Sequence, residues 1–276
     1  MNIFNMDDVA SLKEPRDVLI YYALIHHGDW EKIYSAMKSR GPLPPSDVVN
    51  RVVQNYRNRT VTILDDNYPS WLAKIIRPPF VIFYQGNFSL LSDPDRILAI
   101  SGSPDTDDGY PSGKTREIAR EMAKKGFIVV SGLSRGIQQI ALESALSCGP
   151  GIAVLANGMK AVYPAEAKDL QTRVGQKGLV ISQFADSEPA SAEKMRARNA
   201  FLGQVGKILF VPSCRPQDGI LISIALALRE GRDVGCLPCR ANDPNLNNQL
   251  IREGAALVES AEDLVFEMSS SGRGDS

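Results

Sequence analysis

The sequence predicts an α/β protein with a doubly wound, mostly parallel sheet, preceded by a small helical domain. Short apolar segments rich in β-branched residues alternate with longer helical segments through most of the chain. This alternation is typical of βαβ units, in which helices cover both faces of a parallel sheet. The periodicity changes near residue 61, so we expect a helical domain at 1–60 and the sheet domain at 61–268. The polar end, 269–276, has the composition of a disordered tail.

The helical domain is predicted from apolar residues at helical spacing. In residues 14–40, Val18, Leu19 and Tyr22 fall on one broad apolar face, and 44–56 repeat the pattern after a proline break. Residues 60–75 then indicate a strand, a turn and a helical turn. A second strand is expected at 78–87.

The rest of the chain alternates regularly between the two element types. The predicted strands are 96–101, 127–132, 151–158, 179–183, 207–213, 233–238 and 256–260. The predicted helices are 116–126, 137–149, 166–178, 198–206, 220–231, 247–255 and 261–268. Most of these helices end in glycine, which accepts the left-handed conformation at a helix C-terminus without steric cost.

Composition excludes several classes of protein. The N-terminal residues have no basic segment leading into an apolar run, and no apolar stretch approaches the roughly 20 residues that cross a bilayer. We therefore expect a cytoplasmic protein without membrane contact. Cys236 and Cys239 have C-x-x-C spacing, but no second pair completes a zinc site, so we expect neither a metal nor a cofactor. The net charge of −1 is neutral evidence on nucleic acid, because phosphate binding depends on local charge.

The stretch "ISGSPDTDDGYPSGKT", residues 100–115, has only part of a nucleotide-binding loop. A P-loop needs four residues between its first Gly and Gly-Lys-Ser/Thr, whereas Gly109 lies one residue too close to Gly113 and Asp108 occupies the glycine position. Asp105 and Asp107 add further negative charge. The Gly-x-Gly-x-x-Gly pattern of dinucleotide enzymes is also missing, and no Ser-His-Asp set is available, so the sequence offers no catalytic site.

Glycine-containing loops follow several of the predicted strands. Because ligands bind beyond the carboxyl ends of the strands in open α/β sheets, these loops are candidate phosphate sites. Glycine lets the main chain approach a ligand closely. Each loop alone is equally consistent with a steric role, but their joint presence favours function. The candidates are Gly102, Ser103, Gly132, Arg135, Gly136 and Gly219, with Lys114 as a helper at a helix start and with Arg198 and Asn199 expected just before or at the start of a helix.

Taken together, these motifs resemble the DNA-processing protein A (DprA, or Smf) family over roughly residues 60–266. The similarity is carried by "ILDDNYPSWLAKIIRPPFVIFYQGN", "IVVSGLSRGI", "IAVLANGMKAVYP", "RARN", "ALREGRDVGCLP" and "NNQLIREGAALV", in the family's order. The resemblance implies an N-terminal helical (SAM-like) domain and an extended Rossmann-like domain. It also implies a homodimer that binds single-stranded DNA and loads the RecA recombinase.

By position, the resemblance assigns DNA contact to Gly102 and Ser103, to Gly132, Arg135 and Gly136, to Lys160 in the loop that ends in Tyr-Pro, and to Arg198 with Asn199. The sequence also departs from the family pattern. Pro104 replaces the Arg of its Gly-Ser-Arg turn, Leu142 replaces a His, Ala200 replaces the second Arg of Arg-Asn-Arg, and residues 218–223 lose two hydroxyls. The resemblance therefore implies the fold. The departures remove side chains that the family pattern assigns to DNA contact, so the expected DNA contacts are weaker.

Three functions remain open from the sequence. The first is a non-enzymatic protein that binds single-stranded DNA through loop amides and a few cations, protecting it in natural transformation. The second is a Rossmann-like sensor or processor of nucleotides, although the Gly-Gly-x-Gly-Thr-x-x-Glu stretch of phosphoribohydrolases is missing. The third is an interaction module without a ligand.

Overall fold

A computed structural model describes residues 15–39, 42–104 and 109–270. Its helices are α2 (Pro15–Ile25), α3 (Trp30–Lys38), α4 (Ser46–Val53), α5 (Tyr110–Lys124), α6 (Ile137–Leu146), α7 (Lys168–Lys177), α8 (Ala192–Gly203), α9 (Ile220–Arg229), α10 (Asn247–Arg252) and α11 (Ala261–Ser270). Its strands are β1 (Thr60–Thr62), β2 (Val81–Gly86), β3 (Ile97–Ile100), β4 (Ile128–Ser131), β5 (Gly151–Val154), β6 (Leu179–Ser182), β7 (Ile208–Val211), β8 (Asp233–Cys236) and β9 (Ala256–Leu257).

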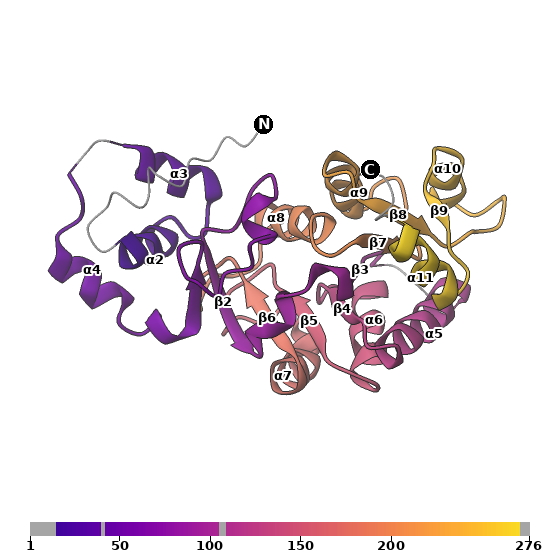
Figure 1. Cartoon of the computed structure of the whole chain (residues 1–276), viewed down its shortest axis with the longest axis horizontal. Coiled ribbons are helices and arrows are strands. Elements are labelled where there is room, and N and C mark those ends of the chain that lie inside the picture. The colour runs from indigo at the N-terminus through magenta and orange to yellow at the C-terminus, as the bar shows by residue number, and fades with distance from the viewer. Residues whose placement is uncertain (1–14, 40–41, 105–108, 271–276) are drawn as a thin grey trace.

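The strands form one sheet in the order β1-β2-β6-β5-β4-β3-β7-β8-β9. The strands from β6 to β9 pair in parallel, whereas β1–β2 and β2–β6 are antiparallel. Figure 1 shows α5, α6 and α7 below the sheet and α8 and α9 above it. The predicted α/β class, with a doubly wound and mostly parallel sheet, is confirmed.

The central strands are continuous apolar runs because helices cover both faces of the sheet. Every residue of β3, β5, β6 and β7 is buried, and these strands read ILAI, GIAV, LVIS and ILFV. An antiparallel sheet with one wet face would alternate apolar and polar residues instead. Burial on both faces makes the sheet a rigid support, and its loops project from a fixed edge.

The N-terminal helices α2–α4 pack on the β1–β2 end of the sheet (Figure 1). Asp29 caps α3 by accepting from the Lys32 N–H. In the same helix, the Trp30 ring stacks on Phe80 at 5.0 Å and its indole N–H donates to the Pro78 carbonyl. Buried side chains of α2, α3 and α4 belong to the same apolar cluster as those of β2 and β6. The domain boundary at residues 60/61 stays a prediction.

At the C-terminal end, α11 extends to Ser270, so the first two residues of the predicted tail are helical. Residues 271–276 lie outside the described residues. The same holds for Asp105, Asp107 and Asp108 of the loop after β3.

Candidate functional site

The candidate site lies where the strand order reverses. From β3, the chain adds β4, β5 and β6 on one side and later adds β7, β8 and β9 on the other. Loops that leave two neighbouring strands toward opposite faces open a crevice at their carboxyl ends, and ligands of α/β proteins bind there. The loop after β3 begins with Ser101 and Gly102, the loop after β4 begins with Gly132, and the loop after β7 includes Ser213 and Gly219.

Main-chain hydrogen bonds join these loops. The Ser103 N–H donates to the Ser213 carbonyl at 2.9 Å, and the Ser103 carbonyl accepts from the Ile137 N–H at 3.4 Å. Gly102 has no room for a side chain, because a Cβ there would lie 2.7 Å from the Ile137 side chain. The loops after β3, β4 and β7 therefore meet in one compact group.

Arg198 reaches this group from the second turn of α8, a helix capped by Ser191. The side chain is buried, with a relative exposure of 5% for the residue. Its Nε donates to Asn199 Oδ1 at 2.9 Å, Nη1 to Gln138 Oε1 at 3.0 Å and Nη2 to Ser134 Oγ at 3.0 Å. All three acceptors are neutral, and no carboxylate of the described residues forms an ion pair with this guanidinium.

Burial lowers the pKa of Arg198 to about 10, and the charge of nearby Tyr163 acts in the opposite direction. A buried cation without an anionic partner is unfavourable, because its desolvation is not offset by a Coulomb attraction. An anion placed beside it would supply that attraction. Arg198 is therefore a candidate anion-binding group.

Close main-chain approach surrounds the guanidinium. A Cβ on Gly132 would lie 2.1 Å from Arg198 Nη1 and 2.3 Å from Gln138 Oε1. On the other side, Asn199 Nδ2 donates to the Gly219 carbonyl at 3.0 Å, and the Asn199 carbonyl accepts from Ser223 Oγ at 2.8 Å. The start of α9 is thereby fixed against α8.

Ser103 contributes an unpaired hydroxyl. The residue is fully buried, and its Oγ has no hydrogen-bond partner. Buried polar groups are nearly always hydrogen-bonded, so an orphan hydroxyl in a ligand crevice is a candidate ligand contact. The structure thus brings together Gly102, Ser103, Gly132, Arg198, Asn199 and Gly219 of the predicted residues.

The remaining predicted cations are already paired; Arg135 and Lys160 are exposed and Lys114 is half-buried. Arg135 forms an ion pair with Glu166, and Lys160 Nζ lies 3.1 Å from Asp186 Oδ2, a carboxylate that also binds Arg59. Lys114 pairs with Glu117 at 3.1 Å. An anion must compete with a carboxylate for each of these three side chains.

Gly136 takes a positive φ of 69° directly before α6, which explains a glycine there on backbone grounds alone.

Two local expectations were wrong. Arg198 and Asn199 were expected just before a helix, but α8 already begins at Ala192, so they lie inside it and face the crevice. Lys114 was expected at a helix start, but it is the fifth residue of α5.

Fewer main-chain N–H groups of the loops are available to a ligand than we expected. The Ser103 N–H is occupied by Ser213, and the Ser134 N–H donates to Gln138 Oε1 at 3.2 Å. Contacts to a ligand would therefore depend more on side-chain groups than we expected.

Sequence reasoning missed Ser134 and Gln138 and gave no role to Tyr163. Gln138 bridges the site, because it accepts from Arg198 while its Nε2 donates to Ser101 Oγ at 2.9 Å. In the sequence it stands beside an equivalent Gln139, and only burial distinguishes the two. Tyr163, which is 47% exposed, was visible only as part of a Tyr-Pro motif.

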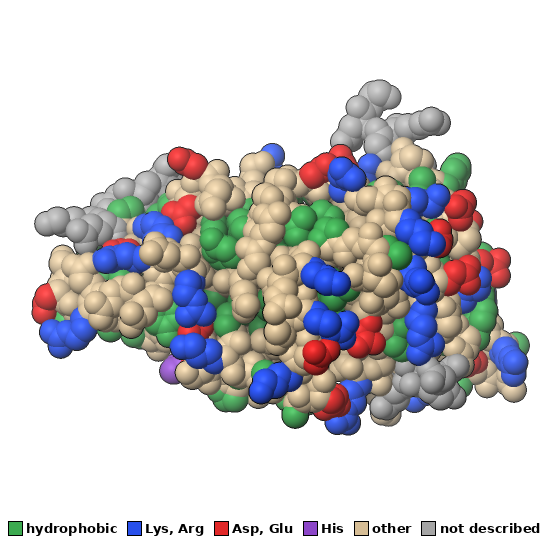
Figure 2. Space-filling view, turned by 90° about the horizontal axis from the view of Figure 1, so that it is seen from below, with side chains coloured by type: hydrophobic (Ala, Val, Ile, Leu, Met, Phe, Trp, Pro, Cys, Tyr) green, Lys and Arg blue, Asp and Glu red, His purple; other side chains and the backbone are tan. Residues whose placement is uncertain are grey.

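On the face shown in Figure 2, basic side chains do not form one continuous field. Figure 2 shows basic and acidic side chains intermixed over the face it views. A row of Lys and Arg side chains lies on its right, the side on which Figure 1 places α5. That helix carries exposed Arg116, Arg120 and Lys124 at four-residue spacing, which places them on one helix face.

The described ranges contain neither a metal-binding cluster nor a helix able to span a membrane. No cluster of three or more His, Cys, Asp or Glu side chains able to hold a metal ion occurs there. No helix in these ranges combines the length and the apolar character that spanning a membrane requires.

Residues 59–269 match the family described as DNA recombination-mediator protein A. The chain belongs to this family. DNA processing protein DprA of Streptococcus pneumoniae is 32% identical over 209 residues, which cover 75% of this chain and 73% of the relative. Protein Smf of Escherichia coli is 30% identical over 202 residues, covering 72% of this chain and 53% of the relative. Membership assigns the chain to DNA processing and recombination mediation.

Solved structures of the family agree with this fold. The X-ray structure of DprA from S. pneumoniae superposes with a TM-score of 0.76 at 27% identity, covering 97% of this chain and 99% of that one. The structure of the Helicobacter pylori DNA processing protein A, described by its single-stranded DNA binding mode, gives a TM-score of 0.69 at 24% identity. It covers 77% of this chain and 96% of that one.

Proposed function

We propose that this chain is a non-enzymatic cytoplasmic protein that binds single-stranded DNA at the crevice around Arg198. In this role it protects incoming DNA and loads the RecA recombinase during transformation or recombination. The observation that carries the binding step is a buried guanidinium that is held by three neutral acceptors and has no ion pair with a described carboxylate. The H. pylori relative, whose single-stranded DNA binding mode is described, supports the choice of polyanion.

The arrangement suits a sequence-independent grip. The Arg198 fork and the Ser103 hydroxyl would contact the sugar-phosphate backbone, while the half-exposed ring of Tyr163 offers a surface on which a base can stack. Arg135 and Lys160 would add long-range attraction once phosphate displaces their carboxylate partners. None of these groups is arranged as a nucleophile with its base, which supports a non-enzymatic role.

Binding of a fluorescent (dT)20 oligonucleotide, followed against salt concentration, tests the proposal. Affinity should fall steadily as salt rises, because phosphate binding releases counterions, and it should differ little between base sequences. The absence of binding at low salt would reject DNA binding. Stabilisation by mononucleotides without oligonucleotide binding would instead favour the nucleotide sensor.

Pro104 provides a test by gain of function. This exposed residue stands where the family has arginine. We expect Pro104→Arg to raise (dT)20 affinity at least about tenfold, since a hydrogen bond to a charged group contributes about 1.5–3 kcal/mol. Pro104→Ala, which frees the backbone without adding charge, is the matched control. Equal affinities for the two variants would show that DNA does not pass this turn.

The dimer and the recombinase step rest on family membership. Light scattering after gel filtration measures the mass of the particle, and a mass of one chain at micromolar concentration would reject the dimer. For the recombinase, the chain should shorten the delay before RecA assembles on single strands coated with single-strand-binding protein. An unchanged delay would remove that step from the proposal.

A further inference from the structure

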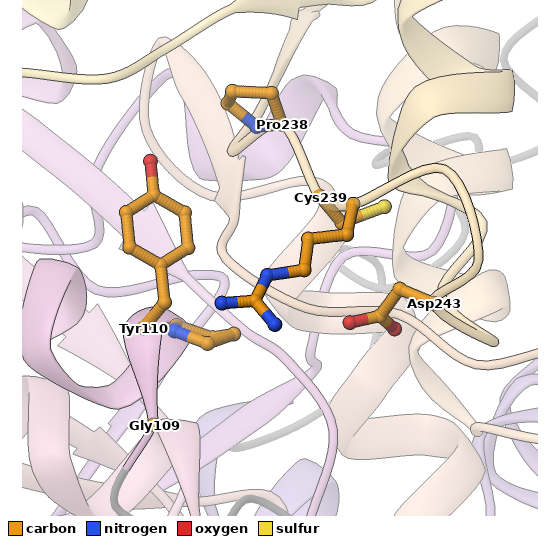
Figure 3. A pocket seen from close by; sticks show the side chains of 7 residues that line it. Gly109, Tyr110, Pro238, Cys239 and Asp243 are labelled. Atoms are coloured by element: carbon orange, nitrogen blue, oxygen red, sulfur yellow. The ribbon is translucent and has the colours of Figure 1, made fainter.

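A second cavity lies on the same edge of the sheet, at the start of α5. Its volume is about 550 Å³, within the range of small-molecule sites. One wall comes from Gly109, Tyr110 and Pro111, and the other comes from Pro238, Cys239, Arg240 and Asp243 in the loop after β8. Figure 3 shows Tyr110 on one side of the cavity and Asp243 on the other. None of these residues belongs to the group around Arg198.

Tyr110 and Arg240 give the cavity its chemistry. Tyr110 is 50% exposed, and its ring packs against no other ring of the described residues, so one face is open to a ligand. Arg240 is exposed, and among the residues that the structure describes it has no acidic partner at ion-pair distance. An aromatic face beside a free guanidinium is the combination that binds a base and its phosphate.

The wall that carries Arg240 is fixed in place. The Cys239 N–H donates to Asn248 Oδ1 at 3.0 Å, and Asn248 Nδ2 donates back to the Cys239 carbonyl at 2.6 Å. Asp243 Oδ1 accepts from both the main-chain and the side-chain nitrogen of Asn245. The Asp243 carboxylate is therefore engaged within its own loop instead of neutralising Arg240.

We propose that this cavity binds one nucleoside monophosphate unit, with its base on Tyr110 and its phosphate at Arg240. In the sheet, β3, β7 and β8 are consecutive, and neighbouring strands lie about 4.8 Å apart. The cavity and the Arg198 crevice are therefore close enough for a few nucleotides of one strand to occupy both. As a subsite for such a strand, the cavity rests on the proposed function. A free mononucleotide carries the same base and phosphate, so it is the other possible source of the bound unit.

Cys239 supplies a direct reporter of occupancy. It lines the cavity and is partly exposed, whereas Cys214 and Cys236 are buried. Cys148 is also partly exposed, so Cys148→Ser leaves Cys239 as the accessible thiol. In this full-length variant, the rate of N-ethylmaleimide addition is measured with (dT)20, with thymidine 5′-monophosphate and without ligand. A bound nucleotide unit should slow the reaction at Cys239.

Variants of the two walls test the contacts. Tyr110→Ala should weaken ligand binding at least about fivefold through lost stacking, whereas Tyr110→Phe should retain it. Arg240→Ala should also weaken binding. Its control is Arg229→Ala, which removes an exposed charge from the end of α9, at the opposite edge of the sheet.

The outcomes separate this inference from the proposed function. If (dT)20 binds in an Arg198-dependent way while Tyr110→Ala and Arg240→Ala bind like the wild type and Cys239 stays reactive, the cavity proposal is wrong and DNA binding stands. If thymidine monophosphate alone protects Cys239 and depends on Tyr110, the cavity is a free-nucleotide site and its role as a subsite for a DNA strand is wrong, whereas the proposed function fails only if (dT)20 also shows no Arg198-dependent binding. If neither probe protects Cys239, the inference is overturned.

Discussion

Arg198 and Arg135 are two arginines of one predicted site with opposite surroundings. Arg198 is buried in α8 and held by three neutral acceptors, whereas Arg135 is exposed and paired with Glu166. Exposed ion pairs contribute little to stability, and water screens them. The buried cation carries a desolvation cost that only an anion offsets. The difference predicts that the partner of each arginine, more than its exposure, decides whether it is available to phosphate.

Removing Arg198 should have the largest effect. We expect Arg198→Ala to weaken (dT)20 binding at least about tenfold, because it removes a charge-assisted contact to phosphate. Fluorescence anisotropy measures the affinity, and thermal unfolding shows whether the variant is folded. Arg198→Lys keeps a charge but loses the planar fork that makes three hydrogen bonds, so it should restore only part of the affinity. Full affinity in a folded Arg198→Ala protein would contradict the proposed site.

A substitution at Gly132 tests whether the position of the Arg198 guanidinium matters for binding. In Gly132→Ala, the new methyl group would lie 2.1 Å from Arg198 Nη1, so the side chain has to move. We expect a loss of about 1–3 kcal/mol in stability and a several-fold loss of affinity. The matched control is Gly113→Ala in α5, where a Cβ meets nothing within 4 Å. That variant should gain about 0.5–1 kcal/mol, because alanine favours helix, and two equally destabilised proteins would contradict this account.

Glu166 should modulate binding by a smaller amount. The Arg135 guanidinium holds the pKa of Glu166 below its ordinary value through a hydrogen bond, so this carboxylate is charged at neutral pH. Glu166→Gln leaves Arg135 with a weaker competitor and should raise (dT)20 affinity about two- to threefold at low salt, as expected for an exposed pair. The gain should vanish in an Arg135→Ala background. A gain that persists there would point to general charge removal.

pH should have the smallest effect. The pKa of Arg198 is lowered to about 10 by burial, so its folded value lies below its unfolded value. The unfolded chain therefore binds more protons as pH rises above about 10, and this group favours folding more as pH rises through that region. The contribution of the Arg198 charge to (dT)20 binding should be lost only above about pH 10. Anisotropy at pH 6.5 and 8.5 should thus agree within about twofold, and a midpoint inside that range would implicate another group.

The sequence predicted the architecture well because periodicity reports burial directly. The runs of β3, β5, β6 and β7 are buried on both faces, and this requires helices above and below. Glycines after strands likewise indicated where the main chain comes close, as Gly132 does to Arg198. These signals are local, so a single sequence contains them.

Pairing between distant side chains was not predictable in this way. Arg198 and Gln138 are 60 residues apart, and Lys160 meets Asp186 across another loop. Nothing local in the sequence distinguishes a cation held by neutral groups from one held by a carboxylate. The N-terminal limit of α8 was misplaced although the sequence carries local signals for it, since Pro189 lies two residues before Ser191, which caps the helix seven residues before Arg198.

The stack of Trp30 on Phe80 has a practical consequence for anyone who trims this protein. A fragment that starts at residue 61 would lose the helices that shield Phe80 and Val81. It would therefore expose a hydrophobic patch at one end of its sheet. Such a fragment should aggregate when it is overproduced. A fragment that keeps α2, α3 and α4 would retain that cover.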